Sequence, residues 1–506
     1  MGSTTKAEEN IAEDAPPLSR SASIVFVATV TGAAFINTFA SQSVVIILPT
    51  IGRKLDIPEA RQQWIVTSYV LTFGCFLLLW GRIADIYGKR TIFILGSLWV
   101  TVISAVNPFI PNEIGFDIFR GLHGLGAAAN VPTAVGILGA TFSSPGRAKN
   151  YAFSAYACGS PLGSIFGTIV SGAVAQYAAW QWIFGIQAIL TGLITIASIY
   201  VIPKNEAVPA NSNTKDLFRD VDWTGGLLVT VSLFMLLFAL AEGNMVGWTT
   251  PYVPSLIAIS VLMLAVFVAW QLHLEKKGDR PPLLKISLFR NFHFSVTMLA
   301  NCFFCASFNN MLVFTTYFFQ DYQGLSLIQT MLRFLPTGLV GVLSPIAVSF
   351  ALGRIPTISL FVASHLLLAA SSLLFGLPLP DDVSYFEWEF WALIFFAIGM
   401  NSFWSCLTLF VSTVLPKEDQ AIAGALMYVF NQLGRAFGLA ISTAVQTAVS
   451  ASSSGNQAEK MGITEPGDKN FLKGIRAACW LDVGFALTSL ALISAAFWKF
   501  EYVQRG

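Results

Sequence analysis

The chain has 506 residues, of which 55% are hydrophobic and 11% charged, and its mean hydropathy is +0.66. This composition excludes an ordinary water-soluble globule and makes the lipid bilayer the expected surroundings. Because the net charge is only +1, no basic face is available to neutralise phosphates, and we expect no nucleic-acid partner.

The beginning of the chain predicts a tail followed by a membrane span. Residues 1–22 are too polar to pack and are expected to form a disordered cytosolic tail. The run 23–48 is long enough to cross a bilayer and is expected to be retained. Similar runs recur and predict an all-α integral membrane protein with fourteen transmembrane helices. The expected spans are 23–48, 64–81, 91–109, 115–141, 150–175, 182–202, 223–242, 252–273, 292–319, 329–351, 356–377, 388–414, 421–449 and 474–498.

The basic residues predict the orientation of these spans. An even number of spans places both ends of the chain on one side of the membrane. Most of the 29 Lys and Arg residues lie in loops on that side, so both termini, including a short tail at 500–506, are expected in the cytosol.

Segment 81–90 has the form of a tight turn between the second and third spans. Gly88 suits a reversal of the backbone with positive φ. Asp85 can pair with Arg82 or Arg90, or lie against the N-terminus of a helix. The fixed positions of the segment are Gly81, Arg82, Asp85, Gly88, Lys89 and Arg90.

The fourth span contains an arginine, Arg120, followed one turn later by His123. An arginine within a span costs about 2.5–3.5 kcal/mol on insertion scales, so it should face the bundle interior and have a partner. Asn37, Thr38 and Gln42 of the first span are the expected partners. The alternative is that Arg120 only ties two helices together.

The fifth span combines small residues with a proline: Gly159, Pro161, Gly163 and Gly167. Small residues four apart let helix backbones approach closely, and the proline bends the helix; a plain packing seam is the alternative interpretation. The pattern of residues 162–174 recurs 271 residues later, at 433–445. This repeat predicts two parallel six-helix halves, at 23–203 and 292–499, with a linker at 204–291 that holds an inserted helix pair.

The second half offers candidate ligand-binding groups. Phe304, Phe308, Asn309 and Tyr317 crowd the ninth span and suit an amphipathic organic ligand, although generic packing explains each one equally well. Arg435 replaces a small residue of the repeat, so it either binds substrate or pairs with a carboxylate. Asp482 in the last span could carry a proton. Because arginines outnumber acids in the spans, neutral or anionic substrates are expected.

Several of these motifs resemble those of a known family, the major facilitator superfamily of transporters. Segment 81–90 resembles its signature loop, and Arg120-x-x-x-Gly124-x-Gly126 resembles its motif in the fourth helix. Gly159 to Gly167 resembles the antiporter motif. Trp180 to Phe184 and Asp222-x-x-Gly225 resemble fourteen-helix drug:proton antiporters, and the wording of residues 120–132 resembles fungal efflux pumps. One departure is Ala40, which stands where bacterial relatives have an Asp.

The resemblance implies proton-coupled efflux of small organic molecules such as drugs, toxins or secondary metabolites. It implies coupling roles for Arg120, His123 and Asp482, and a cytoplasmic latch at Gly81–Arg90. The alternative is a facilitator or importer of a small polar solute such as ammonium or borate.

The same resemblance sets expectations for partners and place in the cell. A plasma-membrane monomer is expected, with the vacuolar membrane as the alternative. We expect no enzyme activity, cofactor or metal, because H-E-x-x-H, G-x-S-x-G and nucleotide-binding patterns do not occur in the sequence and its six cysteines lie in apolar runs.

Overall fold

The computed structural model describes residues 20–57, 59–62, 64–142, 147–203, 221–278, 281–352, 354–377, 384–414, 420–453 and 466–497. Within these ranges the chain is almost entirely helical, and the one β-type pairing is an isolated bridge between Leu352 and Ile355. The all-α prediction is therefore confirmed for the part of the chain that is described. The predicted tails at 1–22 and 500–506 lie almost wholly outside these ranges.

The helices follow one another with short connections. The first nine are α2 (Arg20–Lys54), α3 (Glu59–Gln62), α4 (Trp64–Tyr87), α5 (Lys89–Val106), α6 (Glu113–Thr141), α7 (Arg147–Tyr177), α8 (Trp182–Val201), α10 (Trp223–Val246) and α11 (Tyr252–Lys277). The rest of the long helices are α12 (Phe292–Tyr317), α13 (Leu327–Ala351), α14 (Thr357–Gly376), α15 (Glu389–Val414), α16 (Gln420–Ser453) and α17 (Lys469–Phe497). Short turns are η1 (Asn107–Phe109), η2 (Ile286–Arg290) and the π-helix η3 (Phe318–Tyr322).

Twelve of the described helices are long and apolar enough to cross a membrane. α6 and α16 have the length, at 29 and 34 residues, but they are not among the twelve. Both carry polar side chains along their length, such as Arg120 in α6 and Gln432 and Arg435 in α16. The protein is thus a multi-pass membrane protein, and the count of fourteen spans stays a prediction.

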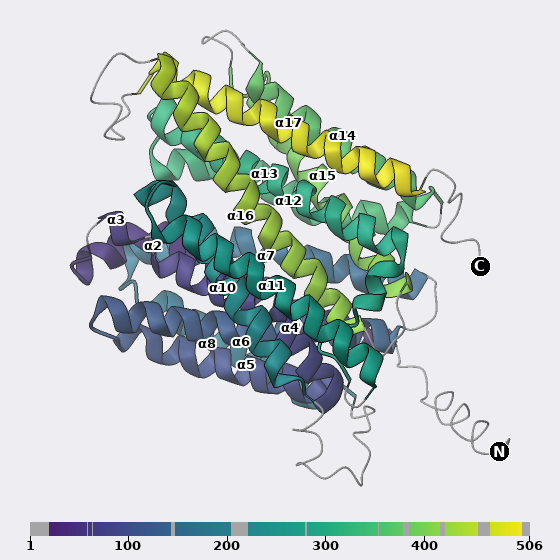
Figure 1. The fold of residues 1–506 in the computed structure, drawn as a ribbon. Coiled ribbons are helices and arrows are strands. Elements are labelled where there is room, and N and C mark those ends of the chain that lie inside the picture. The colour runs from purple at the N-terminus through teal and green to yellow at the C-terminus, as the bar shows by residue number, and fades with distance from the viewer. Residues whose placement is uncertain are drawn as a thin grey trace, which may run out of the picture.

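The helices pack as two groups with contacts between them (Figure 1). In the first group α2 lies along α7 and α8, α4 along α6, and α5 between α6 and α8. In the second, α12 packs on α16 and α17, and α14 on α15 and α17. The groups meet where α4 and α6 contact α16 and where α7 contacts α13, while α10 packs on α4, α11 and α16.

Glycines close one helix pair in each group in the same way. A Cβ at Gly163 of α7 would overlap the carbonyl oxygen of Phe35 in α2. A Cβ at Gly434 of α16, the residue that the repeat pairs with Gly163, would overlap the carbonyl oxygen of Cys302 in α12. The sequence repeat therefore corresponds to a repeated mode of backbone contact between helices.

The turn at 81–90 is tighter than predicted. α4 continues to Tyr87 and α5 begins at Lys89, so that Gly88 alone separates them, with φ of 93°. The positive φ expected of Gly88 is confirmed. The span boundaries are corrected, because residues 82–87 continue α4 rather than forming a loop.

The charges of this turn have different partners from those predicted. Asp85 forms an ion pair of 3.6 Å with Lys89, one turn later. Arg90 instead donates hydrogen bonds to the carbonyl oxygens of Ile202 at 2.8 Å and Ile199 at 2.7 Å, at the end of α8. The prediction of an Asp85 pair with Arg82 or Arg90 is corrected accordingly. Asp419, near which Asp85 was expected to lie, is outside the described residues.

Asp222 caps α10, as one of its two interpretations predicts. Its Oδ1 accepts from the backbone nitrogen of Gly225 at 2.9 Å and from the Trp270 indole at 3.1 Å. Its Oδ2 accepts from Gln271 at 2.7 Å. Because Trp270 and Gln271 belong to α11, this one carboxylate also holds α10 against α11.

Candidate functional site

A fully buried arginine, Arg120 of α6, lies against α4. Its Nε donates a hydrogen bond of 3.0 Å to the carbonyl oxygen of Ile65, and its guanidinium carbon lies 4.8 Å from the centre of the Tyr69 ring, within cation–π range. Its Nη1 and Nη2 are buried and have no hydrogen-bond partner among the described residues. The guanidinium therefore keeps donors for an acceptor such as a carboxylate.

The first helix of the bundle reaches this arginine indirectly. The Tyr69 hydroxyl donates a hydrogen bond to the side-chain oxygen of Asn37 in α2. Asn37, Tyr69 and Arg120 thus form one polar chain across α2, α4 and α6. The prediction that Asn37 belongs to the Arg120 network holds through Tyr69 rather than by direct contact.

Two other partners predicted for Arg120 lie elsewhere. The Thr38 hydroxyl is hydrogen-bonded to Ser160 of α7 at 2.8 Å. Gln42 donates to Ser164 of α7 at 3.3 Å. This prediction is corrected, because both side chains point from α2 toward α7 rather than toward α6.

His123 belongs to the same buried cluster as Arg120. Its Nε2 lies 3.3 Å from the side-chain nitrogen of Gln187 in α8, and its ring meets Tyr69 edge to face with centroids 5.2 Å apart. The other ring nitrogen, Nδ1, has no hydrogen-bond partner among the described residues. The second half of the ring is therefore free to exchange a proton with a water or ligand.

The glycines that follow Arg120 explain why it is held so closely. A Cβ at Gly124 would overlap the carbonyl oxygen of Tyr69 in α4. On the opposite side, a Cβ at Gly126 would lie 2.6 Å from Cδ1 of Trp99 in α5. Side chains at these positions would push α6 away from α4 and with it the Arg120 guanidinium.

The small-residue motif of α7 serves two contacts at once. Gly159, Gly163 and Gly167 face α2. On another face of the helix, Pro161 meets α13, where a Cβ at Gly341 would lie 2.9 Å from the Pro161 Cβ. The packing interpretation of this motif is confirmed on both faces, and the second face lies between the two groups of helices.

The second group of helices contains Arg435 of α16, which is half-buried. Its Nε donates a hydrogen bond of 2.9 Å to the side-chain oxygen of Asn309 in α12. No ion pair joins it to a carboxylate among the described residues. Of the two predicted alternatives, pairing with a carboxylate is therefore not what the structure shows.

Asp482 of α17 is fully buried, and its Oδ1 accepts a hydrogen bond of 2.9 Å from Asn310 of α12. The same amide nitrogen donates to Ser442 of α16 at 2.7 Å, while Asp482 Oδ2 has no partner among the described residues. A peripheral last helix was expected, but α17 packs on α12, α14 and α16, and Asp482 lies inside this contact.

The aromatic candidates of α12 are separated by the structure. Phe304 is fully buried and stacks on Phe403 of α15 with centroids 3.8 Å apart, so it is a core residue of the second group. Phe308 stacks on Phe396 at 5.3 Å. Tyr317 is 40% exposed at the end of α12. The expectation of one shared ligand surface is corrected, because these rings do not gather in one place.

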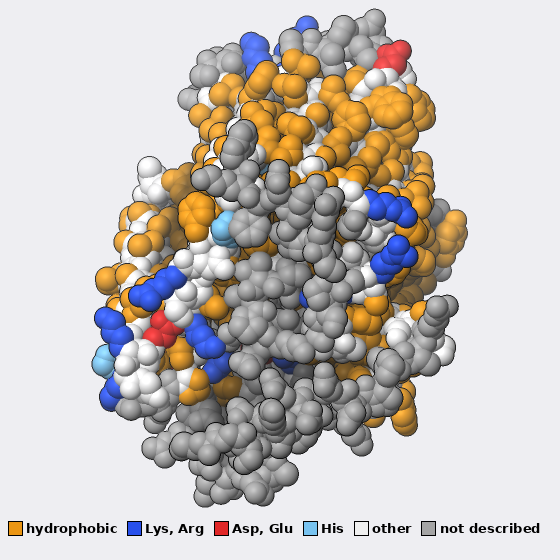
Figure 2. All heavy atoms as spheres, turned by 90° about the vertical axis from the view of Figure 1, so that its right-hand side faces the viewer, with side chains coloured by type: hydrophobic (Ala, Val, Ile, Leu, Met, Phe, Trp, Pro, Cys, Tyr) orange, Lys and Arg blue, Asp and Glu red, His pale blue; other side chains and the backbone are white. Residues whose placement is uncertain are grey.

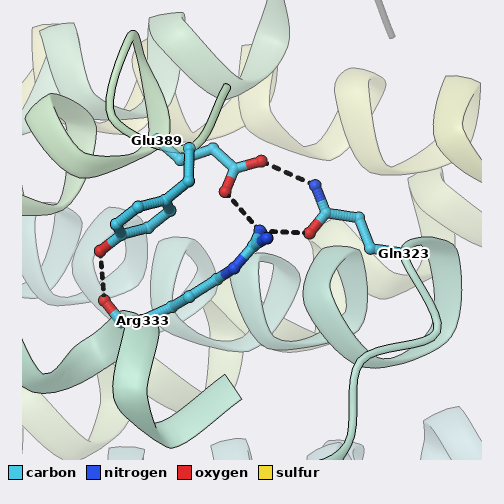
Figure 3. A network of polar contacts seen from close by, with 4 residues as sticks. Gln323, Arg333 and Glu389 are labelled. Carbon is cyan, nitrogen blue, oxygen red and sulfur yellow. Dashed lines mark hydrogen bonds and ion pairs between the residues drawn. The ribbon is translucent and has the colours of Figure 1, made fainter. Parts of the chain in front are cut away.

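A charged network that the sequence interpretation did not contain lies at the start of α15 (Figure 3). Arg333 of α13 binds Glu389 at 2.7 Å and also donates to Gln323, which in turn donates to Glu389 at 2.7 Å. Its guanidinium carbon lies 5.1 Å from the ring centres of both Phe319 and Tyr385. Glu389 had been overlooked among the carboxylates of the spans because it stands at a helix start.

Two tyrosines meet between the groups of helices. The hydroxyls of Tyr156 in α7 and Tyr428 in α16 lie 3.4 Å apart. Tyr428 also stacks on Trp404 of α15 at 5.5 Å and meets Phe73 of α4 at 6.4 Å. The sequence signal that could have found the pair is its separation of 272 residues, which nearly equals the spacing of the repeat.

The comparison with protein families identifies the fold. The family model described as Major Facilitator Superfamily matches residues 30–439. The chain belongs to this superfamily. The resemblance drawn from the motifs is thereby confirmed, and this Major Facilitator Superfamily member is a transporter of small-molecule substrates.

Among its relatives in fungi, three names differ in substrate. A low affinity ammonium transporter of Saccharomyces cerevisiae is 27% identical over 89% of this chain and 83% of its own. Efflux pump terJ of Aspergillus terreus is 26% identical over 94% and 88%. The major facilitator superfamily multidrug transporter mdr3 of Aspergillus fumigatus is 27% identical over 85% and 71%.

Solved structures of the superfamily share the fold of this transporter. The human organic anion transporter MFSD10 (TETRAN) aligns with a TM-score of 0.61 at 15% identity, over 93% of this chain and 99% of its own. The proton:xylose symporter XylE aligns with a TM-score of 0.64 at 11% identity, over 96% of each chain.

Proposed function

We propose that this transporter exports small organic molecules, neutral or anionic, in exchange for protons. The single observation that carries the proposal is Arg120, a fully buried cation with two terminal nitrogens that no described residue binds. The names of the efflux pumps among its relatives support the direction of transport.

The balance of buried charge supports an anionic or neutral substrate. Arg333 is neutralised by Glu389, whereas Arg120 and Arg435 have no carboxylate bound to them among the described residues. Asp117, one turn before Arg120, is joined to it by neither a hydrogen bond nor an ion pair in that part of the chain. A substrate carboxylate would supply the acceptors that these guanidinium groups lack.

We propose fourteen spans in two six-helix halves, α2–α8 and α12–α17, with α10 and α11 as an inserted pair. α6 and α16 count as spans because they pack centrally, on α4 and α12, and contact each other. Their polar residues then face the protein interior rather than lipid.

Both termini are proposed to face the cytosol. α3, which follows the end of α2, lies at the left of the bundle and the end of α17 at the right (Figure 1), so the described chain begins and ends on one side. Figure 2, which views the molecule from that side, shows several Lys and Arg side chains and few acids among the described residues. This asymmetry supports a cytosolic face. The plasma membrane is the proposed location, with the vacuolar membrane as the alternative.

In the proposed mechanism the two halves rock about a central site. The tyrosine pair Tyr156 and Tyr428 and the residues Arg120, Asn37 and Arg435 bind substrate there. Proton coupling is assigned to three groups: Arg120, His123 and Asp482. Asn309 orients Arg435 through its hydrogen bond, and Gln42 acts on substrate only if it leaves Ser164.

The latch of the mechanism is the turn at Gly88. Asp85 and Lys89, on either side of it, move with α4 and α5 when the halves rock. Arg90 fixes this turn to the end of α8, so the latch moves as part of the first half.

The test of this function measures retention of a fluorescent carboxylate, a neutral compound and a quaternary ammonium dye in pump-deleted yeast that express the chain. We expect reduced retention of the carboxylate or the neutral compound, restored by a protonophore and by Arg120→Ala. The matched control is Arg290→Ala, an exposed arginine of η2. Preferential export of the ammonium dye would overturn the proposed substrate class.

A second candidate function is import of a small polar solute such as ammonium or borate. The ammonium transporter among its relatives, which covers 89% of this chain, favours this alternative. Unchanged retention of all three compounds, together with growth on limiting ammonium that depends on the chain, would replace efflux by this function.

A further inference from the structure

Outside the groups assigned to transport, His365 of α14 is fully buried and contacts a partner through each ring nitrogen. Its Nδ1 lies 2.6 Å from the carbonyl oxygen of Phe361, one turn earlier. Its Nε2 lies 2.8 Å from the hydroxyl oxygen of Ser489 in α17. Ser489 in turn donates 2.7 Å to the carbonyl oxygen of Ala300 in α12. One chain of three hydrogen bonds thus joins α14, α17 and α12.

These three bonds need three hydrogens. A carbonyl oxygen only accepts, so Nδ1 must carry a hydrogen for Phe361, and Ser489 must give its single hydroxyl hydrogen to Ala300. The remaining contact then needs a hydrogen on Nε2, which makes the His365 ring an imidazolium. A neutral ring has one hydrogen fewer, so Ser489 must turn away from Ala300 or Nε2 must stay unbound.

The surroundings of the ring contain aromatic faces rather than a counter-ion. The ring centres of Phe304 and Phe403 lie 5.0 Å and 5.4 Å from that of His365, and aromatic rings within about 6 Å attract a cation. α12, α15 and α17 pack on α14, and their buried titratable side chains are Cys305, Glu389, Cys406, Cys479 and Asp482. The half-buried Arg476 of α17 is a further charge.

None of these groups hydrogen-bonds to His365. The nearest carboxylate along α17, Asp482, stands seven residues before Ser489, which is about 10 Å along the helix axis. An ion pair with His365 is therefore not available, and the charge state of the ring depends on its hydrogen bonds and on the two aromatic faces.

We propose that His365 is a second proton-binding site of this protein, separate from Arg120, His123 and Asp482. Its proton completes the chain from α14 through Ser489 to α12. Desolvation opposes the charged ring, whereas three complete hydrogen bonds favour it, so the site fills as the pH falls. When the proton leaves, either the contact of α17 with α14 or that with α12 is lost. The proposal needs no substrate and goes beyond the transport function.

The test is ¹⁵N NMR of purified protein labelled at histidine, across a range of pH. The chain has only four histidines, and His365→Gln identifies the signals of His365 by their loss. We expect a neutral ring protonated at Nδ1 at about pH 8 and an imidazolium at about pH 5. A His365 signal that keeps one state from about pH 4 to about pH 9 would overturn the proposal.

A second variant separates the hydrogen-bond chain from general burial. Ser489→Ala removes the acceptor of Nε2–H and should lower the midpoint by about one pH unit. The matched control is Thr488→Ala, because this neighbour is exposed and binds only Gly484 of its own helix. If Ser489→Ala titrates as the wild-type protein does, the chain does not hold the proton. Should His365→Gln fail to fold, the signal displaced in Ser489→Ala still identifies His365.

Discussion

At the scale of single residues, Arg120 contributes a charge that its surroundings do not neutralise. The chain supplies one hydrogen bond from Ile65 and one aromatic face from Tyr69, and it leaves two terminal nitrogens unbound among the described residues. Breaking a charge-assisted bond to substrate costs about 1.5–3 kcal/mol, or roughly 10- to 100-fold.

We therefore expect Arg120→Ala to lower the rate of substrate export by about tenfold or more at equal surface expression. Arg120→Lys should recover only part of it, because an ammonium lacks the planar fork that binds a carboxylate. Initial rates of export from preloaded cells measure both. Equal rates in Arg120→Ala and in the exposed control Arg290→Ala would reduce Arg120 to a structural residue.

Arg435 permits a sharper test, because the repeat pairs it with Ser164. Arg435→Ser should lower export of a carboxylate compound by about tenfold while leaving export of a neutral compound within about twofold. The ratio of the two export rates is the measurement. A parallel loss for both compounds would mean that Arg435 stabilises the bundle rather than selecting substrate charge.

At the scale of helices, the glycine seams set the distance between α2 and α7 and between α12 and α16. The sequence predicted these close contacts from the spacing of small residues, since spacing along one helix is a local property. It could not predict that Thr38 and Gln42 turn toward α7, or that Glu389 meets Arg333 from 56 residues away, because such contacts depend on how distant helices are placed.

The seam leads to a stability prediction. Gly163→Val should lower the free energy of unfolding by about 1–3 kcal/mol, because its side chain would overlap the carbonyl oxygen of Phe35. The control on the same helix is Gly172→Val, since the nearest atom to a Cβ there is Cε of Met331 at 3.6 Å. Thermal melting in detergent compares the two, and equal melting temperatures would refute the seam.

At the scale of the whole molecule, the account depends on movement of two halves against each other. The repeat predicted the halves, and the structure adds where they meet: α7 on α13, α4 on α16 and the hydroxyls of Tyr156 and Tyr428. The sequence gave no direct signal for the tyrosine pair, because each tyrosine stands outside the repeated motif.

The latch belongs to this scale. Asp85→Asn removes the charge that pairs with Lys89 and should reduce turnover several-fold while leaving insertion and surface level unchanged. Lys89→Ala should have a smaller effect than Arg120→Ala. Turnover is measured per transporter, with surface level determined by labelling. Unchanged turnover in Asp85→Asn at equal surface level would refute the latch.

The most direct test of proton-coupled export uses purified protein in liposomes. The lumen is made acidic relative to the outside, and uptake of a labelled organic anion is followed. The account predicts accumulation that collapses with a protonophore and is absent in Arg120→Ala. Passive diffusion of a weak acid would run the other way, since it concentrates in the more alkaline compartment. Uptake that is the same with and without the pH gradient would contradict the account.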